Sequence, residues 1–261
     1  MQLPTKYSAG CKNIDELLGG GFESGTVTQL YGEAGSGKTN ICLQTAVECA
    51  RKGKTVIFID SEGFSPERFL QIANATLNPL QGLRGRGAEP HSANTNTNET
   101  SETVERIAQR ITIYEPHSFE QQTSCIDEIE ELIKEKEGKN GVALVILDSA
   151  TLFYRLELDE ERSIYLRRVL ANQIMHLLEI ARRYDLAVII TNQVYMDIEA
   201  GNLRPSGGYA LEHLSKVIVQ FEKTAEGRGK RRAVLRKHRS MPEDTSCEFL
   251  ITGKGVEDIQ E

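Results

Sequence analysis

The stretch Gly32-Glu-Ala-Gly-Ser-Gly-Lys-Thr39 decides how the rest of the chain is interpreted. It matches the spacing G-x-x-x-x-G-K-[ST], in which glycines let the backbone turn closely around an anion. The apolar residues 27–31 before it are typical of a buried strand, and residues 38–52 after it predict a helix that ends at Gly53. Strand, glycine loop and helix N-terminus together predict a phosphate-binding site, because backbone N–H groups and the positive helix end point at the same place.

Individual residues of this loop have different expected roles. Lys38 is expected to place its ammonium group on the β and γ phosphates of ATP, and the Thr39 hydroxyl is expected to bind Mg²⁺. The predicted ATP-contacting residues of the loop are Gly32, Glu33, Ala34, Gly35, Ser36, Gly37, Lys38, Thr39 and Asn40. ATP and Mg²⁺ are therefore the predicted cofactors.

Further apolar runs place this loop in a larger sheet. The runs Thr55–Ile59, Val142–Leu147 and Leu186–Thr191 are too short for helices and are apolar at successive positions, as in strands buried on both faces. Two segments have apolar residues at helical spacing. The first, from Cys125 to Ile133, precedes the run Val142–Leu147, and the second, from Leu166 to Ala181, lies between that run and Leu186–Thr191. Strands that alternate with helices predict an α/β fold with a mainly parallel sheet covered on both faces.

The C-terminal part of the chain predicts antiparallel strands. Lys216–Glu222 and Arg232–Arg236 flank the glycine-containing segment Thr224–Lys230, which is typical of a hairpin. The length of 261 residues suits one sizeable domain, so we expect a single domain over residues 1–261. Within it, residues 76–103 have few apolar side chains to bury and are expected to form a disordered surface insertion.

Polar residues follow three of the predicted strands. Asp148 comes directly after Val142–Leu147 and is expected to hold Mg²⁺ or its bound water. Glu62 is the best placed acid to polarise the attacking water, with Asp60 as its rival. Gln193 follows the strand that ends near Thr191 and could sense the γ phosphate. Because the carboxyl ends of parallel strands meet at one edge of a sheet, we expect these side chains to lie near the glycine loop.

The net charge of −7 argues against a protein that coats polyanions with its whole surface, so any nucleic-acid contact is expected to be local. A basic stretch from residue 228 to residue 239 stands out in this acidic chain. The candidate DNA-contacting side chains are Arg228, Lys230, Arg231, Arg232, Arg236, Lys237, His238 and Arg239. The alternative is a solvated hairpin whose charges only protect a sheet edge.

The composition also bounds the cellular setting. No apolar run approaches the ~20 residues that cross a bilayer, and no apolar stretch follows a basic N-terminus. We therefore expect a cytoplasmic protein without membrane contact. The five cysteines form no metal-binding spacing with the five histidines, so we expect reduced and mostly buried thiols.

Four motifs together are similar to those of the RecA/RadA recombinase superfamily, and most closely to its archaeal RadB paralogues. They are Ser8–Gly21 before the glycine loop, Phe58–Gly63 with Pro66–Arg68, Val145–Ala150, and Thr191–Val194. They occur in the family's order and cover nearly the whole chain.

The resemblance implies a RecA-like P-loop ATPase core and assigns roles to several residues. It makes Glu62 the general base for water, Asp148 the Walker B acid and Gln193 the γ-phosphate sensor. Arg68 falls where the family packs a guanidinium group against adenine. Pro242 falls in a segment that caps ATP from a neighbouring subunit, so an oligomer is possible.

The chain departs from the family in its DNA-binding parts. It enters the ATPase core by residue 8, so we expect no N-terminal helix-hairpin-helix domain. The first DNA loop, Tyr154–Glu161, is net acidic, and in the second, Val194–Ser206, Arg204 alone opposes the acidic residues. These departures favour an ATP-binding, weakly hydrolysing accessory protein of recombination and repair that binds DNA and assists a RadA-type recombinase. The alternatives are a filament-forming strand-exchange recombinase and a RecA-like ATPase with no DNA role.

Overall fold

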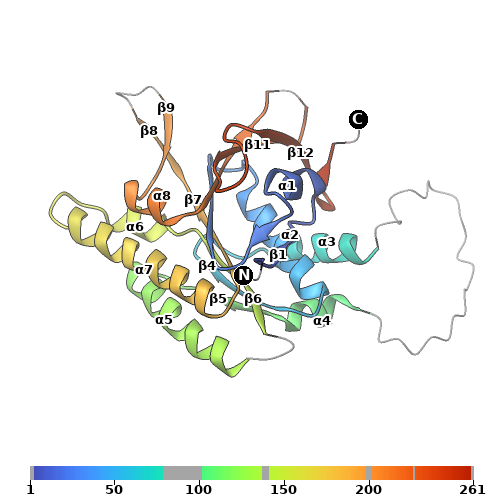
Figure 1. Cartoon of the computed structure of the whole chain (residues 1–261), viewed down its shortest axis with the longest axis horizontal. Helices are drawn as coiled ribbons and strands as arrows, with labels where there is room; N and C mark the ends of the chain where they lie inside the picture. Colours follow the sequence, from blue (N-terminus) through green and yellow to red (C-terminus); the bar gives the residue numbers. More distant parts are fainter. Residues whose placement is uncertain (1–2, 79–101, 137–140, 198–201, 226, 260–261) are drawn as a thin grey trace, which may run out of the picture.

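A nine-stranded sheet forms the centre of the molecule, in the strand order β13-β12-β11-β10-β3-β7-β6-β4-β5 (Figure 1). The computed structural model describes residues 3–78, 102–136, 141–197, 202–225 and 227–259. The strands from β10 to β5 in this order are parallel, and those from β10 to β13 are antiparallel. Their bounds are β3 Val27–Gly32, β4 Thr55–Asp60, β5 Ile111–Tyr114, β6 Val142–Asp148, β7 Ala187–Asn192, β10 Val217–Lys223, β11 Lys230–Lys237, β12 Ser246–Thr252 and β13 Gly255–Asp258.

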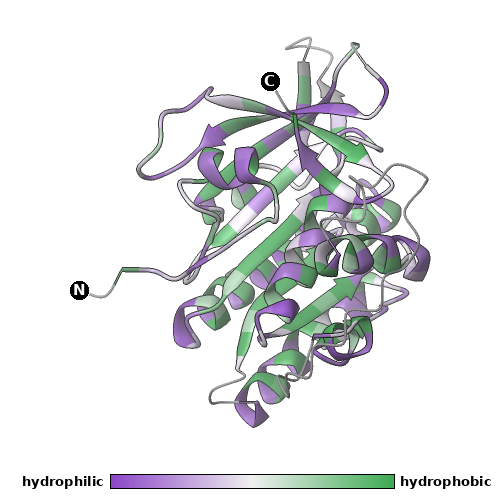
Figure 2. Cartoon of the chain, turned by 90° about the vertical axis from the view of Figure 1, so that its right-hand side faces the viewer, coloured by the Kyte–Doolittle hydropathy of each residue, from purple (hydrophilic) through white to green (hydrophobic). Residues whose placement is uncertain are grey.

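Helices cover both faces of the sheet and enclose a separate hydrophobic core on each side. The first core includes side chains of α1 Lys12–Leu17, α2 Lys38–Arg51, α3 Pro66–Leu77 and α4 Val104–Gln109. The second includes those of α5 Phe119–Glu135, α6 Leu152–Glu157, α7 Ser163–Arg183 and α8 Tyr209–Leu214. Alternate residues of β4 enter opposite cores, with Phe58 in the first and Ile59 in the second. Figure 2 shows these hydrophobic strands between helices with hydrophilic outer surfaces.

The predicted α/β fold with a mainly parallel sheet and C-terminal antiparallel strands is confirmed. The predicted strands before and after the glycine loop correspond to β3, β4, β6 and β7, and α2 ends at Arg51, one residue earlier than predicted. The predicted hairpin is present as β10 and β11, in which Phe221 lies opposite Ala233. Both faces of this hairpin bury apolar side chains, because Val234 and Leu235 point to opposite sides and are both buried.

Two segments differ from the loops that the family resemblance implies. The predicted first DNA loop, Tyr154–Glu161, begins as part of helix α6. The predicted second DNA loop, Val194–Ser206, contains an antiparallel ribbon of β8 Val194–Asp197 and β9 Asn202–Pro205. A small pair of strands, β1 Lys6–Tyr7 and β2 Phe22–Glu23, precedes the main sheet.

The ends of the predicted insertion 76–103 are part of helical structure. Helix α3 continues to Leu77, and the Thr103 hydroxyl accepts a hydrogen bond from Arg106 N at 3.3 Å at the start of α4. Residues 79–101 lie outside the described residues, so the prediction for the rest of the segment stays a prediction.

The cysteines are free and mostly buried, as predicted. Cys11, Cys42 and Cys49 are buried, while Cys125 and Cys247 are partly buried. Burial raises the pKa of the Cys42 thiol well above its usual range and raises the pKa of Cys49 to about 12. Across the described residues, none of the helices has the length and apolar character required to cross a membrane.

Candidate nucleotide-binding site

The glycine loop joins β3 to α2, as its motif predicts. Strand β10 runs parallel to β3, with Phe221 opposite Gly32. A Cβ atom on Gly32 would lie 2.1 Å from the Phe221 carbonyl oxygen, so a larger residue would force the two strands apart. Gly37, the N-cap of α2, has a φ of 110°, which glycine adopts without the strain that other residues would suffer. The loop therefore turns tightly between β10 and α2, with the positive end of α2 beside it.

Lys38 is buried inside the loop. Its Nζ atom donates hydrogen bonds to the carbonyl oxygens of Gly32 at 2.8 Å and Glu33 at 3.0 Å. Glu33 O also accepts from Ser36 N at 3.2 Å. Burial lowers the pKa of Lys38, and the nearby carboxylates of Asp148 and Glu62 oppose this shift. The same ammonium group and backbone N–H could turn from these carbonyl oxygens to phosphate oxygens.

Asp148 ends β6 beside this loop and is completely buried. Its Oδ1 atom accepts a hydrogen bond from the Thr191 hydroxyl, whereas its buried Oδ2 atom has no hydrogen-bond partner. Burial raises the pKa of Asp148, and the hydrogen bond from Thr191 opposes the rise. A buried carboxylate oxygen without a partner is costly unless something binds it. Asp148 and Thr39 thus offer oxygen ligands of the kind that Mg²⁺ prefers.

The remaining ligands of such an ion would be water and phosphate oxygens and not further acidic side chains. No group of three His, Cys, Asp or Glu side chains suited to a metal occurs in the part of the chain that the structure describes. Mg²⁺ commonly binds through one or two protein oxygens and completes its shell with water and phosphate oxygens. The donor set at Thr39 and Asp148 has that character.

A hydrogen-bonded path leads from Glu62 to α6. Glu62 is exposed just past β4, and its Oε1 atom accepts a hydrogen bond from Gln193 Nε2 at 2.8 Å. Gln193 Oε1 in turn accepts a hydrogen bond from the Arg155 guanidinium group. The structure therefore brings together the predicted base and the predicted phosphate sensor. It adds Arg155, which the sequence analysis did not single out.

Asp60, the rival of Glu62, has a different environment. It is buried at the end of β4 opposite Asp148, and its Oδ2 atom accepts a hydrogen bond from Gly63 N at 2.9 Å. Burial and the Asp148 carboxylate raise the pKa of Asp60 to about 6. Asp60 shapes the turn that leads to Glu62, whereas Glu62 is open to water. The assignment of the base to Glu62 stays a prediction with this geometry behind it.

Arg68, predicted to pack against adenine, lies at the junction of α2, α3 and the C-terminal strands. Its guanidinium group donates to Asn40 Oδ1 at 2.6 Å and to the carbonyl oxygens of Thr252 at 2.8 Å and Gly255 at 3.3 Å. These bonds fix the plane of the guanidinium group next to the predicted loop residue Asn40. Pro242 is exposed between β11 and β12, and its predicted contact concerns a second subunit.

Most basic side chains of the predicted DNA-binding stretch have partners within the chain. The partners are Glu248 for Lys230, Gly35 O for Arg231, Asp244 and Glu222 for Arg236, Glu212 O for Lys237, backbone N–H groups for His238, and Glu23 for Arg239. Arg228 and Arg232 are exposed and form no ion pair with a described residue. These two side chains are the part of the stretch best suited to meet phosphate.

A hollow of about 580 Å³ with an aromatic and basic lining lies where α6, the β8–β9 ribbon and the start of α8 meet. Arg155 and Arg167 line it together with Tyr195 and Tyr209, whose exposed fractions are 48% and 77%. Sequence reasoning missed it because residues 154–161 were counted as one acidic loop. As a helix, α6 points Arg155 toward Gln193, whereas Glu157 accepts a hydrogen bond from the first residue of α5.

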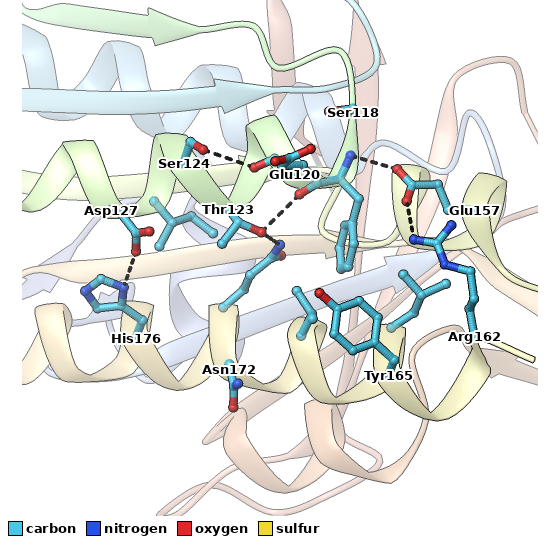
Figure 3. A pocket seen from close by; sticks show the side chains of 15 residues that line it. Ser118, Glu120, Thr123, Ser124, Asp127, Glu157, Arg162, Tyr165, Asn172 and His176 are labelled. Atoms are coloured by element: carbon cyan, nitrogen blue, oxygen red, sulfur yellow. Dashed lines mark hydrogen bonds and ion pairs between the residues drawn. The ribbon is translucent and has the colours of Figure 1, made fainter.

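A larger hollow of about 720 Å³ lies between α5 and α7 (Figure 3). Apolar and polar side chains line it together, and among the polar ones His176 Nδ1 lies 3.2 Å from Asp127 Oδ1. None of the predicted nucleotide-site residues lines this hollow. The candidate nucleotide site is therefore distinguished by its loop and carboxylate chemistry and not by cavity size.

The fold and the glycine loop define a RecA-like P-loop ATPase domain. The protein-family model described as "ATPase: KaiC" matches residues 7–261. The chain therefore carries an ATP-binding domain of this type.

Individual relatives narrow the family further. The DNA repair and recombination protein RadB of Methanococcoides burtonii is 52% identical over 249 residues, which cover 95% of this chain and 96% of that protein. The RadB protein of Archaeoglobus fulgidus is 42% identical over 258 residues, 98% of each chain. A crystal structure of the RadB recombinase matches with a TM-score of 0.75 and 33% identity, covering 97% of this chain and 100% of that one. The chain belongs to the RadB family of DNA repair and recombination proteins.

Proposed function

We propose that this chain is an ATP-binding, weakly ATP-hydrolysing accessory protein of homologous recombination and DNA repair, which binds DNA and assists a RadA-type recombinase. The observation that carries this proposal is the path from Glu62 through Gln193 to Arg155. It joins the nucleotide site to the hollow that contains Tyr195 and Tyr209. The names of the relatives support the link to repair and recombination.

Within the nucleotide site, Lys38 and the loop N–H groups bind the phosphates, and Thr39 and Asp148 would hold Mg²⁺, which would neutralise phosphate charge. Glu62 accepts a proton from the water whose oxygen forms the new bond to the γ phosphorus, while the bridging oxygen leaves with ADP. Slow turnover follows from the bond between Gln193 and Glu62, because the amide competes with water for the same carboxylate oxygen.

DNA contact is assigned to two surfaces. The hollow beside α6 suits unpaired bases, since exposed tyrosines stack on bases and the neighbouring arginines meet the backbone. Arg228 and Arg232 on the C-terminal hairpin suit phosphates in any sequence. We expect the hollow to prefer single-stranded DNA, because stacking requires unpaired bases, and the hairpin arginines to bind single and double strands alike.

Nucleotide binding is tested by titrating ATP with Mg²⁺ into the Lys38→Ala variant. We expect the affinity to fall by about a hundredfold or more, because a buried cation bound to phosphate is lost. Lys52→Ala is the matched control, since it removes the same charge at the exposed C-terminal end of α2. If Lys38→Ala and Lys52→Ala bound ATP equally well, the proposed nucleotide site would be wrong.

DNA binding is tested by mobility shifts with single- and double-stranded oligonucleotides of equal length. Tyr195→Ala with Tyr209→Ala should weaken single-strand binding by about tenfold or more and leave duplex binding nearly unchanged. Arg228→Ala with Arg232→Ala should weaken both about equally. A wild-type protein that binds neither oligonucleotide at low salt would instead be a RecA-like ATPase without a DNA role.

An active strand-exchange recombinase is the second candidate, favoured by the description of the solved relative as a recombinase. Light scattering with single-stranded DNA and a non-hydrolysable ATP analogue separates filaments from small oligomers. The accessory function predicts small species and co-elution with a RadA-type recombinase on size-exclusion chromatography. ATP-dependent filaments together with joint-molecule formation would establish the recombinase instead.

A further inference from the structure

The outer side of the glycine loop is covered by the hairpin of β10 and β11. The parallel pairing of β10 with β3 places Phe221 opposite Gly32, so the end of β10 reaches the loop. Lys223 and Arg231 are direct partners across the hairpin. The lysine chain also lies next to Gly35, where an added Cβ atom would be 3.5 Å from Lys223 Cε. Two cations from the antiparallel part of the sheet thus adjoin the loop from outside.

Arg231 is bonded directly to the loop backbone. Its Nε atom donates a hydrogen bond to Gly35 O at 3.0 Å, and its Nη1 atom donates to Lys230 O at 2.7 Å. The second bond limits the rotation of the guanidinium plane, so the first has a defined direction. A hydrogen bond from a charged donor to a carbonyl oxygen is stronger than one between neutral groups.

The geometry of the peptide unit gives this bond a consequence inside the loop. In a trans peptide, the carbonyl oxygen of one residue and the N–H of the next point in opposite directions. Arg231 holds Gly35 O from the outer side, so the Ser36 N–H points to the inner side. There it donates to Glu33 O at 3.2 Å, the same oxygen that accepts from Lys38. Ser36 N–H and Lys38 therefore converge on one point.

The charge arrangement at Lys223 and Arg231 has no evident structural purpose. Like charges directly opposite each other on neighbouring strands repel and cost stability. Among the described residues, neither side chain forms an ion pair with a carboxylate. Lys223 also contributes to the lowered pKa of Lys38. An anion in the loop would turn this repulsion into attraction.

We infer that Arg231 is a positioning residue for nucleotide binding, which orients the Gly35–Ser36 peptide so that the Ser36 N–H meets a phosphate oxygen, while Lys223 adds long-range positive charge. The inference rests on the proposed function, because it requires that the loop bind ATP. The two side chains contribute to the affinity for ATP in different ways. Arg231 acts through a directed hydrogen bond, and Lys223 acts through its charge alone.

The affinity for ATP with Mg²⁺ should therefore respond differently to four substitutions. Arg231→Ala should raise the Kd about tenfold at both low and high salt, because the loss of a directed bond is not screened. Arg231→Lys should raise it about threefold, since charge remains without the fixed geometry. Lys223→Ala should raise it about threefold at low salt and not at about 1 M salt. Arg51→Ala removes the same charge at the far end of α2, where Arg51 pairs with Glu48, and should leave the affinity for ATP unchanged.

A second readout separates positioning from a general loss of structure. In the nucleotide-free Arg231→Ala protein, hydrogen exchange at the Ser36 amide should be about tenfold faster, because its bond to Glu33 O is no longer held. Exchange in the centre of β6 and urea unfolding should match those of Arg51→Ala. Arg231→Ala with the ATP affinity and Ser36 exchange of Arg51→Ala would refute the inference. Unchanged ATP affinity in Lys38→Ala would instead refute the proposed nucleotide site itself.

Discussion

The two parts of the sheet contribute opposite charges to the same loop. From β3 to β5 the strands are parallel, and their carboxyl ends present Asp60 and Asp148, with Glu62 and Gln193 just beyond strand ends. From β10 to β13 the strands are antiparallel and present the loop with apolar side chains, backbone oxygens and cations. The parallel part has the groups suited to chemistry on a phosphate, and the antiparallel part supports the loop that holds it.

This difference follows from how strands end. In a parallel sheet all carboxyl ends lie at one edge, so residues far apart in sequence converge there. In antiparallel strands neighbouring ends alternate, and cross-strand pairs such as Lys223 and Arg231 lie side by side. The antiparallel part supports the loop by packing. The ring of Phe249 lies so close to Gly37 that an added Cβ atom there would be 3.4 Å from it. Substitutions should separate the two parts by what they change: turnover for one, loop geometry and stability for the other.

The largest expected effect is on stability, from the antiparallel part. Phe249 is fully buried and its ring packs edge-on against Phe221, with centroids 5.7 Å apart. Phe249→Ala should lower the free energy of unfolding by about 3–5 kcal/mol, because it leaves a cavity next to the loop. Urea unfolding measures this. Leu250→Ala on the same strand, at a partly buried position, is the control and should cost clearly less.

The next effect is on turnover, from the parallel part. Glu62→Gln should lower kcat about a hundredfold or more while ATP affinity stays within about twofold, because a proton acceptor is lost and no phosphate contact is. Steady-state phosphate release and ATP titration measure the two quantities. Normal turnover in Glu62→Gln combined with loss in Asp60→Asn would move the base role to Asp60.

A smaller effect concerns pH and Asp60. Because its pKa is raised to about 6 in the folded protein, the folded state holds this proton more tightly than the unfolded chain, and stability falls as pH rises through roughly 4 to 6. Asp60→Asn should remove this loss and stabilise the protein at pH 8 by about 1–2 kcal/mol, after allowance for solvent screening. Urea unfolding without Mg²⁺ at pH 4 and pH 8 tests it. An equal effect of Asp60→Asn at both pH values would contradict the buried-carboxylate explanation.

The smallest effect is on DNA affinity through a single exposed cation. Arg232→Ala should reduce the slope of log affinity against log salt concentration by about one, with ATP affinity unchanged. Mobility shifts at several salt concentrations measure the slope. The Arg236→Ala variant is the comparison. Because Arg236 already pairs with Asp244, its substitution should change the slope less than that of Arg232. The reverse order would mean that the internal ion pairs of the hairpin open on DNA.

Sequence patterns predicted the parallel part well. A continuous apolar run such as β6 predicts a strand that is buried on both faces. In a parallel sheet, the residues that follow such strands then lie together at one edge. Glu62 and Gln193 were placed together in this way, and the structure joins them by a hydrogen bond. The short strand β5 was not predicted, because its four residues include only partly buried and exposed positions and give little pattern.

The antiparallel part was harder to predict in its details. The hairpin was evident from its glycines, but the bond between Arg231 and Gly35 depends on register and on the reach of a long side chain. Strands β12 and β13 lack a continuous apolar pattern. Most cations of residues 228–239 are bonded within the chain, which a count of charges along the sequence could not show. Likewise, the hollow that contains Tyr195 and Tyr209 could not be predicted, because it forms only when residues of the expected loop adopt the helical conformation of α6.

The placement of the free thiols on the two sides of the sheet has a practical consequence. Cys42 and Cys49 lie on α2 in the first core, whereas Cys125 packs against the second. Thiols with a raised pKa that are shielded from solvent react slowly with alkylating reagents until the structure around them opens. Mass-spectrometric alkylation rates at the buried Cys42 would therefore report the opening of the first layer without any introduced label, while the partly buried Cys125 is a reference that reacts without such opening. Bound nucleotide should slow the reaction of Cys42, one turn beyond Lys38, more than that of Cys125.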